Sequence, residues 1–305
     1  MTAGAPELDP GTLRHAEVDG LRTRYYQAGD SQAPALLLVH GGQYGSWYAL
    51  DSWDTVLTPL AERFRVIALD RPGQGHTQSR SAPDGYRWDA GARHLERFVD
   101  EVLGGPAHIV GHSRGALLVA GLALRRPELV RSLTLVDAGS LAPEDAAYPR
   151  SEAFYARLAA PPPGVPGPEA LRIEPEAQSV STAHLTEDFV RRMVEIARLP
   201  AIVEARARMA ELRATVFQPS LDEARREALA GIAERGLPSP TLVLWGAEDP
   251  STPALAGERL AELVARRTPR SEMRLIERAG HYCFREQPSE FVRTLVGFLD
   301  GPADE

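Results

Sequence analysis

Ser113 is the side chain in this sequence whose surroundings best suit nucleophilic chemistry. It stands in Gly111-His112-Ser113-Arg114-Gly115, a G-x-S-x-G pattern that follows a short apolar run and precedes a helix-like segment. Small residues on both sides permit the sharp strand-to-helix turn that exposes a nucleophilic hydroxyl. The bare pattern is weak evidence, because a serine that merely caps a glycine-flanked helix would look the same.

An acid and a histidine follow Ser113 in a suggestive order. Asp249 comes after a late apolar run and His281 after the last one. The carboxyl ends of parallel strands meet at one edge of a sheet, so these side chains can converge on the serine. Glu248 or Asp137 could supply the carboxylate instead, with Asp249 only a turn residue, and the histidine could be structural.

A glycine-rich turn at His40-Gly41-Gly42-Gln43 follows the first predicted core strand. Backbone N–H groups at such a turn can stabilise a developing oxyanion, and we expect the N–H of Gly42 to act with that of Arg114. A phosphate-binding turn or a plain loop is the alternative, although the spacing does not fit a dinucleotide fingerprint.

Three aromatic residues continue the same loop: Tyr44, Trp47 and Tyr48. Aromatic side chains commonly line the pockets of small-molecule substrates. They also pack well beneath a lid, so both interpretations stay open.

No cofactor and no metal is expected. The chain has one cysteine, Cys283, and no lysine, which excludes a cysteine-rich zinc site, a P-loop and Schiff-base chemistry. His108 and His112 have the spacing of a metal-binding pair, but they fall on a predicted strand and no adjacent glutamate completes the motif.

The elements that must position these residues alternate between strands and helices. Two extended runs joined at Asp19-Gly20 predict an opening hairpin. Unbroken apolar runs predict buried strands near 35–39, 66–69, 108–110, 133–136, 241–245 and 273–276. Helix-like segments separate them, which indicates a parallel sheet with crossover helices.

A helical insertion interrupts this rhythm between residues 139 and 238. We find no strand-like run there, only helix-like segments near 151–159, 186–198, 201–215 and 221–235. The proline-rich stretch 161–168 separates the first segment from the others. The sequence therefore predicts a core made of residues 1–138 and 239–305, with residues 139–238 as a lid.

The composition narrows the partners to small molecules. The formal net charge is −8, which disfavours binding of nucleic acid. The longest apolar stretches fall far short of the roughly 20 residues of a membrane span, so no membrane partner is expected. No secretory signal is visible, and we expect a cytoplasmic protein that is a monomer or a homo-oligomer.

Taken together, the motifs resemble those of the α/β-hydrolase superfamily. Besides the segments around Gly42, Ser113, Asp249 and His281, the likeness includes Asp70-Arg71-Pro72-Gly73-Gln74-Gly75. It implies an α/β-hydrolase fold with an eight-stranded, mostly parallel sheet, a helical cap between the sixth and seventh strands, and a Ser-His-Asp triad. A serine at position 113 separates the chain from the dehalogenase and epoxide hydrolase branches, which carry aspartate there.

Within the superfamily, the segment 185–192 and the residues after His281 resemble the meta-cleavage product hydrolases, which cleave C–C bonds. The chain departs from them at His112, at Gln43-Tyr44, and at Tyr282, which stands where they typically have tryptophan. Tyr282 is therefore a further candidate for binding the substrate. It is also similar to proline iminopeptidases at 40–42. Arg191 or Arg192 in the predicted cap could bind a substrate carboxylate, although paired arginines usually form a solvated face.

We therefore expect a serine hydrolase that cleaves a small, largely apolar ester, lactone or ketone through an acyl-enzyme. Two other classes stay open. One is a ligand-binding protein that keeps the hydrolase frame, and the other is a lyase, cyclase or cofactor-free oxygenase that uses the His-Asp pair as a base.

Overall fold

A single sheet organises the structure, a computed structural model that describes residues 8–158 and 165–301. Its strands are β1 (Leu13–Val18), β2 (Leu21–Ala28), β3 (Ala35–Val39), β4 (Arg65–Leu69), β5 (Ala107–His112), β6 (Val130–Val136), β7 (Thr241–Gly246) and β8 (Ser271–Ile276). The eight strands lie in the order β1-β2-β4-β3-β5-β6-β7-β8. β2 is antiparallel to β1 and β4, and the remaining pairs are parallel. The predicted fold class is confirmed.

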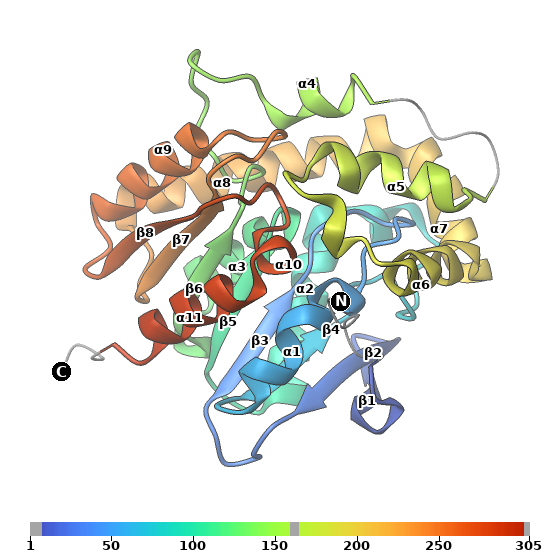
Figure 1. The fold of residues 1–305 in the computed structure, drawn as a ribbon, viewed down its shortest axis with the longest axis horizontal. Helices are drawn as coiled ribbons and strands as arrows, with labels where there is room; N and C mark the ends of the chain where they lie inside the picture. Colours follow the sequence, from blue (N-terminus) through green and yellow to red (C-terminus); the bar gives the residue numbers. More distant parts are fainter. Residues whose placement is uncertain (1–7, 159–164, 302–305) are drawn as a thin grey trace.

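Helices cover both faces of the sheet (Figure 1). The core helices are α1 (Asp54–Ala61), α2 (Trp88–Phe98), α3 (Arg114–Arg125), α9 (Ala254–Ala265), α10 (Cys283–Glu286) and α11 (Pro288–Leu299). Successive side chains of β3 alternate between the faces. Leu37 belongs to a buried cluster that includes residues of α2, α3 and α9, whereas Leu36 belongs to one that includes residues of α1 and α11.

The connection from β6 to β7 carries the cap, whose helices gather on one side of the molecule (Figure 1). They are α4 (Ser151–Tyr155), α5 (Pro168–Ala177), α6 (Glu187–Arg198), α7 (Pro200–Leu212) and α8 (Gln218–Arg235). In its described part this connection contains no strand, as the sequence predicts. The helix α5 is an addition to the prediction, and residues 161–164 of the proline-rich stretch lie outside the described residues.

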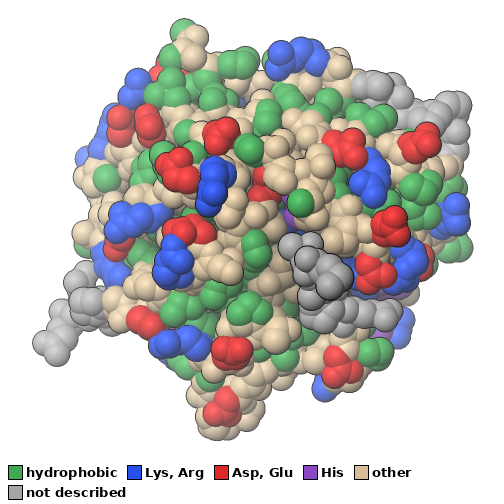
Figure 2. All heavy atoms as spheres, in the orientation of Figure 1, with side chains coloured by type: hydrophobic (Ala, Val, Ile, Leu, Met, Phe, Trp, Pro, Cys, Tyr) green, Lys and Arg blue, Asp and Glu red, His purple; other side chains and the backbone are tan. Residues whose placement is uncertain are grey.

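Charged side chains of both signs intermingle on the face seen in Figure 2. Elsewhere in the structure as in this view, charge is balanced locally by ion pairs, such as those of Arg259 with Asp145 and Arg191 with Glu195 among the described residues. None of the helices in the described ranges combines the length and the apolar composition that a membrane crossing requires.

Candidate active site

Ser113 lies at the turn from β5 into α3, where its backbone is strained. Its φ of 54° and ψ of −122° fall in a region that costs a non-glycine residue about 1–3 kcal/mol. Its N–H donates to Val136 O at 2.9 Å, and Ser140 Oγ donates to Ser113 O at 3.0 Å. The serine side chain makes no capping hydrogen bond to α3. The hydroxyl is therefore available for chemistry, which argues against a simple helix cap.

Gly115 lets α3 begin close to the end of β3. A Cβ at this position would lie 2.4 Å from Val39 O and 2.7 Å from His40 O. Any larger residue would push the helix away from the sheet. The second glycine of the pattern is thus needed to place Ser113 beside the turn that follows β3.

The imidazole of His281, after β8, is held by Asp249, after β7. The His281 Nδ1 and Asp249 Oδ2 atoms lie 2.7 Å apart. The other carboxylate oxygen accepts hydrogen bonds from the N–H and the hydroxyl of Ser251, both at 2.7 Å, and from the N–H of Thr252 at 3.1 Å. A proton on Nδ1 leaves Nε2 as the basic atom of the ring. That atom is buried and has no partner among the described residues.

The electrostatic surroundings favour the cationic form of His281. Burial lowers the pKa of this imidazole, but the charge of Asp249 and its hydrogen bond raise it, with smaller contributions from Asp137 and Glu174. The net result is a pKa above the ordinary value of 6.5. This environment suits a base that must carry a proton briefly.

Neither of the two alternative carboxylates makes a hydrogen bond to the His281 ring in the described part of the chain. Glu248 is exposed. Asp137 is buried and accepts a hydrogen bond from the N–H of Gly246 at 2.8 Å, while its Oδ2 has no partner in the described part of the chain. Burial and the neighbouring Asp249 raise the pKa of Asp137 well above its ordinary value.

Asp137, Asp249 and His281 are also the donor set that could hold a metal ion, because one ligand atom of each lies within 4.8 Å of the others. However, the Asp249 and His281 atoms nearest each other already share a hydrogen bond. We interpret the cluster as one that orients the imidazole.

The turn after β3 passes directly beside Ser113. A Cβ at Gly41 would lie 2.9 Å from the Ser113 Cβ, so only a glycine fits. The N–H of Gly42 has no acceptor among the described residues. The N–H of Arg114 belongs to the first turn of α3, where amides lack an intrahelical acceptor. Both amides are thus available to an oxyanion formed at Ser113.

Three donors hold the carbonyl of Gly41. They are His40 Nδ1 at 2.9 Å, Arg71 Nη1 at 3.1 Å and Gln74 Nε2 at 3.2 Å. Because the N–H and C=O of a trans peptide point in opposite directions, the Gly42 N–H is directed away from these donors. The His40 ring accepts from the Arg71 N–H through Nε2, so the proton resides on Nδ1. Burial lowers the pKa of His40 to about 3, consistent with this neutral form.

Besides donating a hydrogen bond to Gly41, Arg71 brings a positive charge to the turn after β3. Its Nη1 lies 3.1 to 3.3 Å from the carbonyl oxygens of His40, Gly41 and Gly42. Burial lowers the pKa of Arg71 to about 10. In the ranges that the structure describes, no carboxylate lies within ion-pair distance of it, so its positive charge near Ser113 is not neutralised locally. Sequence reasoning gave this residue no role.

A cavity of about 370 Å³ opens above Ser113 and His281. Its other walls are Arg114, Tyr155 of α4, residues of the 139–150 segment, and residues of α8. This volume is within the range of small-molecule sites.

The four aromatic residues expected at the substrate site pack outside the described lining of this cavity. Tyr44 packs against Phe217 at a ring distance of 6.2 Å. Trp47 stacks on Tyr48 at 4.2 Å, and the hydroxyls of Tyr48 and Tyr282 lie 2.5 Å apart. These contacts favour the interpretation that the aromatic loop supports the cap.

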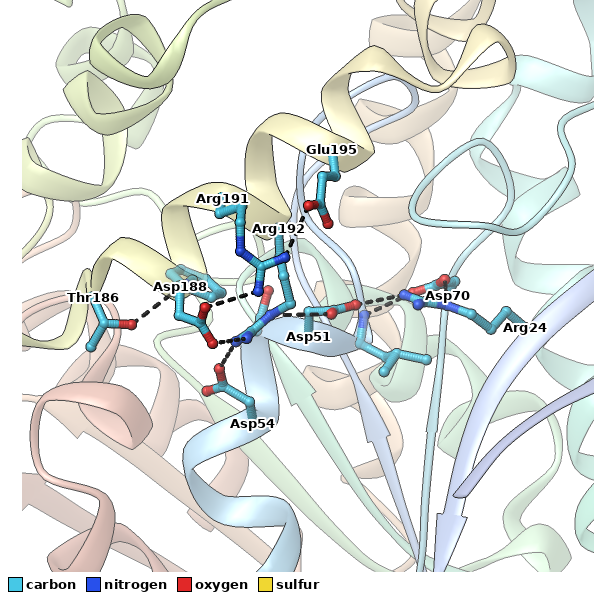
Figure 3. A network of polar contacts seen from close by, with 12 residues as sticks. Arg24, Asp51, Asp54, Asp70, Thr186, Asp188, Arg191, Arg192 and Glu195 are labelled. Carbon is cyan, nitrogen blue, oxygen red and sulfur yellow. Dashed lines mark hydrogen bonds and ion pairs between the residues drawn. The ribbon is translucent and has the colours of Figure 1, made fainter. Parts of the chain in front are cut away.

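Arg191 and Arg192 also lie outside the described lining of the cavity. Arg191 is exposed and pairs with Asp188 and Glu195 of its own helix. Arg192 is buried and pairs with Asp54 of α1 (Figure 3). The expectation that either arginine reaches a substrate carboxylate does not fit these contacts, because their charges are already paired elsewhere.

The cap adds polar residues that sequence reasoning missed. Gln178 Nε2 donates to the Tyr155 hydroxyl at 2.9 Å, and Gln178 O accepts from the His281 N–H at 2.9 Å. Glu174 accepts from the Tyr48 hydroxyl at 3.4 Å. The spacing of polar residues on α5 is the one sequence signal for these residues. It is hard to recognise because two prolines, Pro168 and Pro175, argue against a helix there.

Comparison with known proteins places this chain in a family. A family model described as "alpha/beta hydrolase fold" matches residues 34–288. The chain is 30% identical to the dihydrolipoyllysine-residue acetyltransferase component of the acetoin cleaving system from Cupriavidus necator, over 94% of this chain and 68% of that protein.

Two further similar proteins are hydrolases by name. The 2-hydroxy-6-oxo-6-(2'-aminophenyl)hexa-2,4-dienoic acid hydrolase of Metapseudomonas resinovorans is 27% identical, over 95% of this chain and 92% of that protein. A variant of the meta-cleavage product hydrolase CumD has a similar structure, with a TM-score of 0.73, 25% identity, and coverage of 96% of this chain and 100% of that chain.

Proposed function

Since the chain belongs to the α/β-hydrolase fold family, we propose that it is a serine hydrolase with Ser113 as nucleophile. One observation carries the proposal. The His281 imidazole is held by Asp249 through Nδ1, and its Nε2 is left without a partner among the described residues, in a ring that lines the same cavity as Ser113. This is the arrangement that activates a serine hydroxyl.

His281 takes the proton of Ser113 as the serine oxygen attacks the substrate carbonyl. The imidazolium then returns this proton to the leaving group, and an acyl-serine remains. Water, deprotonated by the same ring, releases the acyl group. Asp249 keeps the ring in one tautomer and stabilises its cation throughout.

The N–H groups of Gly42 and Arg114 stabilise the oxyanion of the tetrahedral intermediate. Loss of one such donor in other enzymes costs about 3 kcal/mol of transition-state stabilisation. The carbonyl of Gly41 is fixed by three donors, so the Gly42 amide needs little reorganisation when charge develops.

The substrate is a small ester, lactone or ketone. The cavity volume of about 370 Å³ supports a small acyl group. The similar proteins include a hydrolase of a dienoic acid and the acetyltransferase component of an acetoin cleaving system. Both C–O and C–C cleavage start with the same serine attack on a carbonyl.

The test is turnover of p-nitrophenyl butyrate together with labelling by a fluorophosphonate. The wild-type protein should hydrolyse the ester and be labelled at Ser113, and Ser113→Ala should lose both while its circular dichroism is retained. Ser140→Ala is the matched control, because Ser140 is the other serine of the described cavity lining and its loss should leave labelling intact.

Each other outcome identifies another function. Labelling without turnover of any ester would favour a ligand-binding protein on the hydrolase frame. Activity that survives Ser113→Ala would contradict the serine mechanism and favour an enzyme that uses the His-Asp pair as a base.

A further inference from the structure

The guanidinium of Arg114 differs from the other arginines of the cavity. Arg225, on α8, lies 3.3 Å from Glu144 and donates to Ala142 O at 2.6 Å. Arg150 also pairs with Glu144, at 3.2 Å. By contrast, no carboxylate in the described part of the chain lies within ion-pair distance of Arg114, which lines the cavity next to the nucleophile.

Tyr155 stands opposite this guanidinium. The Arg114 Cζ lies 6.0 Å from the centre of the Tyr155 ring, and both residues line the cavity. The Tyr155 hydroxyl accepts a hydrogen bond from Gln178 Nε2 at 2.9 Å, so its own proton is free to be donated. A cation and a hydroxyl donor therefore face the same space.

Glu174 is the carboxyl group whose field reaches Arg114, but the two form no ion pair. Burial raises the pKa of Glu174, and its contact with the Tyr48 hydroxyl directs one of its oxygens elsewhere. A partly buried guanidinium such as that of Arg114 costs free energy of desolvation, and a ligand that supplies a negative charge offsets this cost.

We propose that the side chain of Arg114, with the Tyr155 hydroxyl, binds a carboxylate on the acyl part of the substrate. The residue then acts twice: its backbone N–H stabilises the oxyanion, and its guanidinium selects an acyl chain that ends in an anion. The substrate is then a short acyl compound with a carboxylate at the far end of the acyl chain. It is either the monoester of a dicarboxylic acid or a keto acid. This inference rests on the proposed serine hydrolase function.

The test compares two esters that differ only at the end of the acyl chain. p-Nitrophenyl hydrogen adipate carries a carboxylate where p-nitrophenyl hexanoate carries a methyl group. The ratio of their kcat/KM values should fall roughly 10- to 100-fold in Arg114→Gln, because charge-assisted hydrogen bonds are lost. Arg114→Lys should retain part of the ratio, since it keeps the charge but not the fork. Any common loss through the oxyanion cancels in the ratio.

Two more variants sharpen the test. Tyr155→Phe removes only the hydroxyl and should lower the same ratio by several-fold. Arg191→Gln removes an exposed cap arginine outside the described cavity lining and should leave the ratio as it is. An equal ratio in wild type and Arg114→Gln would overturn the proposal, while Ser113-dependent turnover of the neutral ester would keep the hydrolase function.

Calorimetry with adipate separates the subsite from the reaction. Adipate should bind to the wild-type protein at least 10-fold more tightly than to Arg114→Gln. Equal affinity, or no binding to the wild type, would overturn the subsite whether or not either ester is hydrolysed. Absence of turnover with a normal affinity difference would overturn the hydrolase function alone.

Discussion

Two buried aspartates stand near one imidazole, and their hydrogen bonds give them different roles. Asp249 is surrounded by donors, with its two oxygens engaged by Ser251, Thr252 and His281. Asp137 accepts a hydrogen bond from the Gly246 N–H, and burial and the neighbouring Asp249 raise its pKa. Hydrogen bonds to both oxygens hold the Asp249 carboxylate in place against the ring, so Asp249 is the one positioned to stabilise an imidazolium.

We therefore expect Asp249→Asn to lower kcat by about 10³- to 10⁴-fold, because an amide would favour the wrong imidazole tautomer. Asp137→Asn should cost at most about 10-fold, since the hydrogen bond to the ring comes from Asp249 and not from Asp137. Steady-state kinetics on p-nitrophenyl butyrate measure both. A larger loss in the Asp137 variant would exchange the two assignments.

The pH dependence of kcat/KM follows from the pKa of His281. The base must be neutral, so activity falls as the pH drops through this pKa. Because the pKa is raised, the acid limb should have its midpoint above pH 6.5. In Asp249→Asn the main raising contribution is gone and burial remains, so the midpoint should move to lower pH. A pH–rate profile of both proteins tests this, and a midpoint that moves upward would contradict it.

Arg71 is expected to be a positioning residue for the oxyanion turn. Arg71→Met removes the donor shared by the carbonyls of His40, Gly41 and Gly42, so kcat should fall about 10- to 100-fold with little change in KM. Arg71→Lys should recover part of kcat, which a purely structural role would not explain. Arg22→Met, at an exposed position of β2, is the control. Equal changes of kcat and KM in all three variants would count against this role.

The sequence could indicate Ser113, Asp249 and His281 because each of them follows a predicted parallel strand. The carboxyl ends of such strands meet at one edge of the sheet. The sequence could not indicate how Arg71 or Tyr155 act. Arg71 acts through backbone carbonyls, which every residue has, so no pattern of side chains indicates its partners. Tyr155 lines the cavity only because of how the cap folds over the core, which no local pattern predicts. The same limit explains Arg191 and Arg192, whose ion pairs depend on how α6 docks.

At the scale of elements, α6 is fixed to the core by a buried ion network. Figure 3 shows Arg192 of α6 directed at Asp54 and Asp51, while Arg24 of β2 lies between Asp51 and Asp70. Each of these side chains is less than a tenth exposed. The network joins the cap to the segment that begins α1.

Removal of one charge from this network should be costly. Asp54 binds Arg192 and also Arg285, the latter at 2.6 Å, so Asp54→Asn leaves two buried guanidinium groups without their full counter-charge. We expect a loss of about 3–5 kcal/mol in the free energy of unfolding. Asp188→Asn, which affects a carboxylate that is 46% exposed, should cost less than about 1 kcal/mol. Urea titrations measure the free energy of unfolding of both variants. Similar losses would contradict a stabilising role of the buried ion network.

The strands could be predicted closely because buried parallel strands are unbroken apolar runs, as β3 at Ala35–Val39 illustrates. The helix α5 could not. Pro168 and Pro175 suggest a break, yet the first occupies the initial turn, where no N–H is needed. Burial of Leu171 of α5 in the cluster that also holds Phe189 then outweighs the second proline.

At the scale of the whole molecule, the cap and the core share one hydrophobic cluster. Phe189 and Met193 of α6 belong to the same buried cluster as Leu36 of β3 and Trp53 beside α1. Apolar side chains that pack continuously across a boundary couple the parts on either side. The cap is therefore expected to unfold together with the core.

Phe189→Ala tests this coupling. Its ring is 2% exposed, so truncation should lower the free energy of unfolding by about 3–5 kcal/mol. All four tryptophans, at positions 47, 53, 88 and 245, lie outside the 139–238 insertion. Tryptophan fluorescence therefore reports the core and, through Trp47 and Trp88, its contacts with the cap. Far-ultraviolet circular dichroism reports the helices of both parts. If they unfold as one unit, both signals shift to the same lower urea midpoint in the variant. A dichroism change that precedes the fluorescence change would mean that the cap unfolds separately.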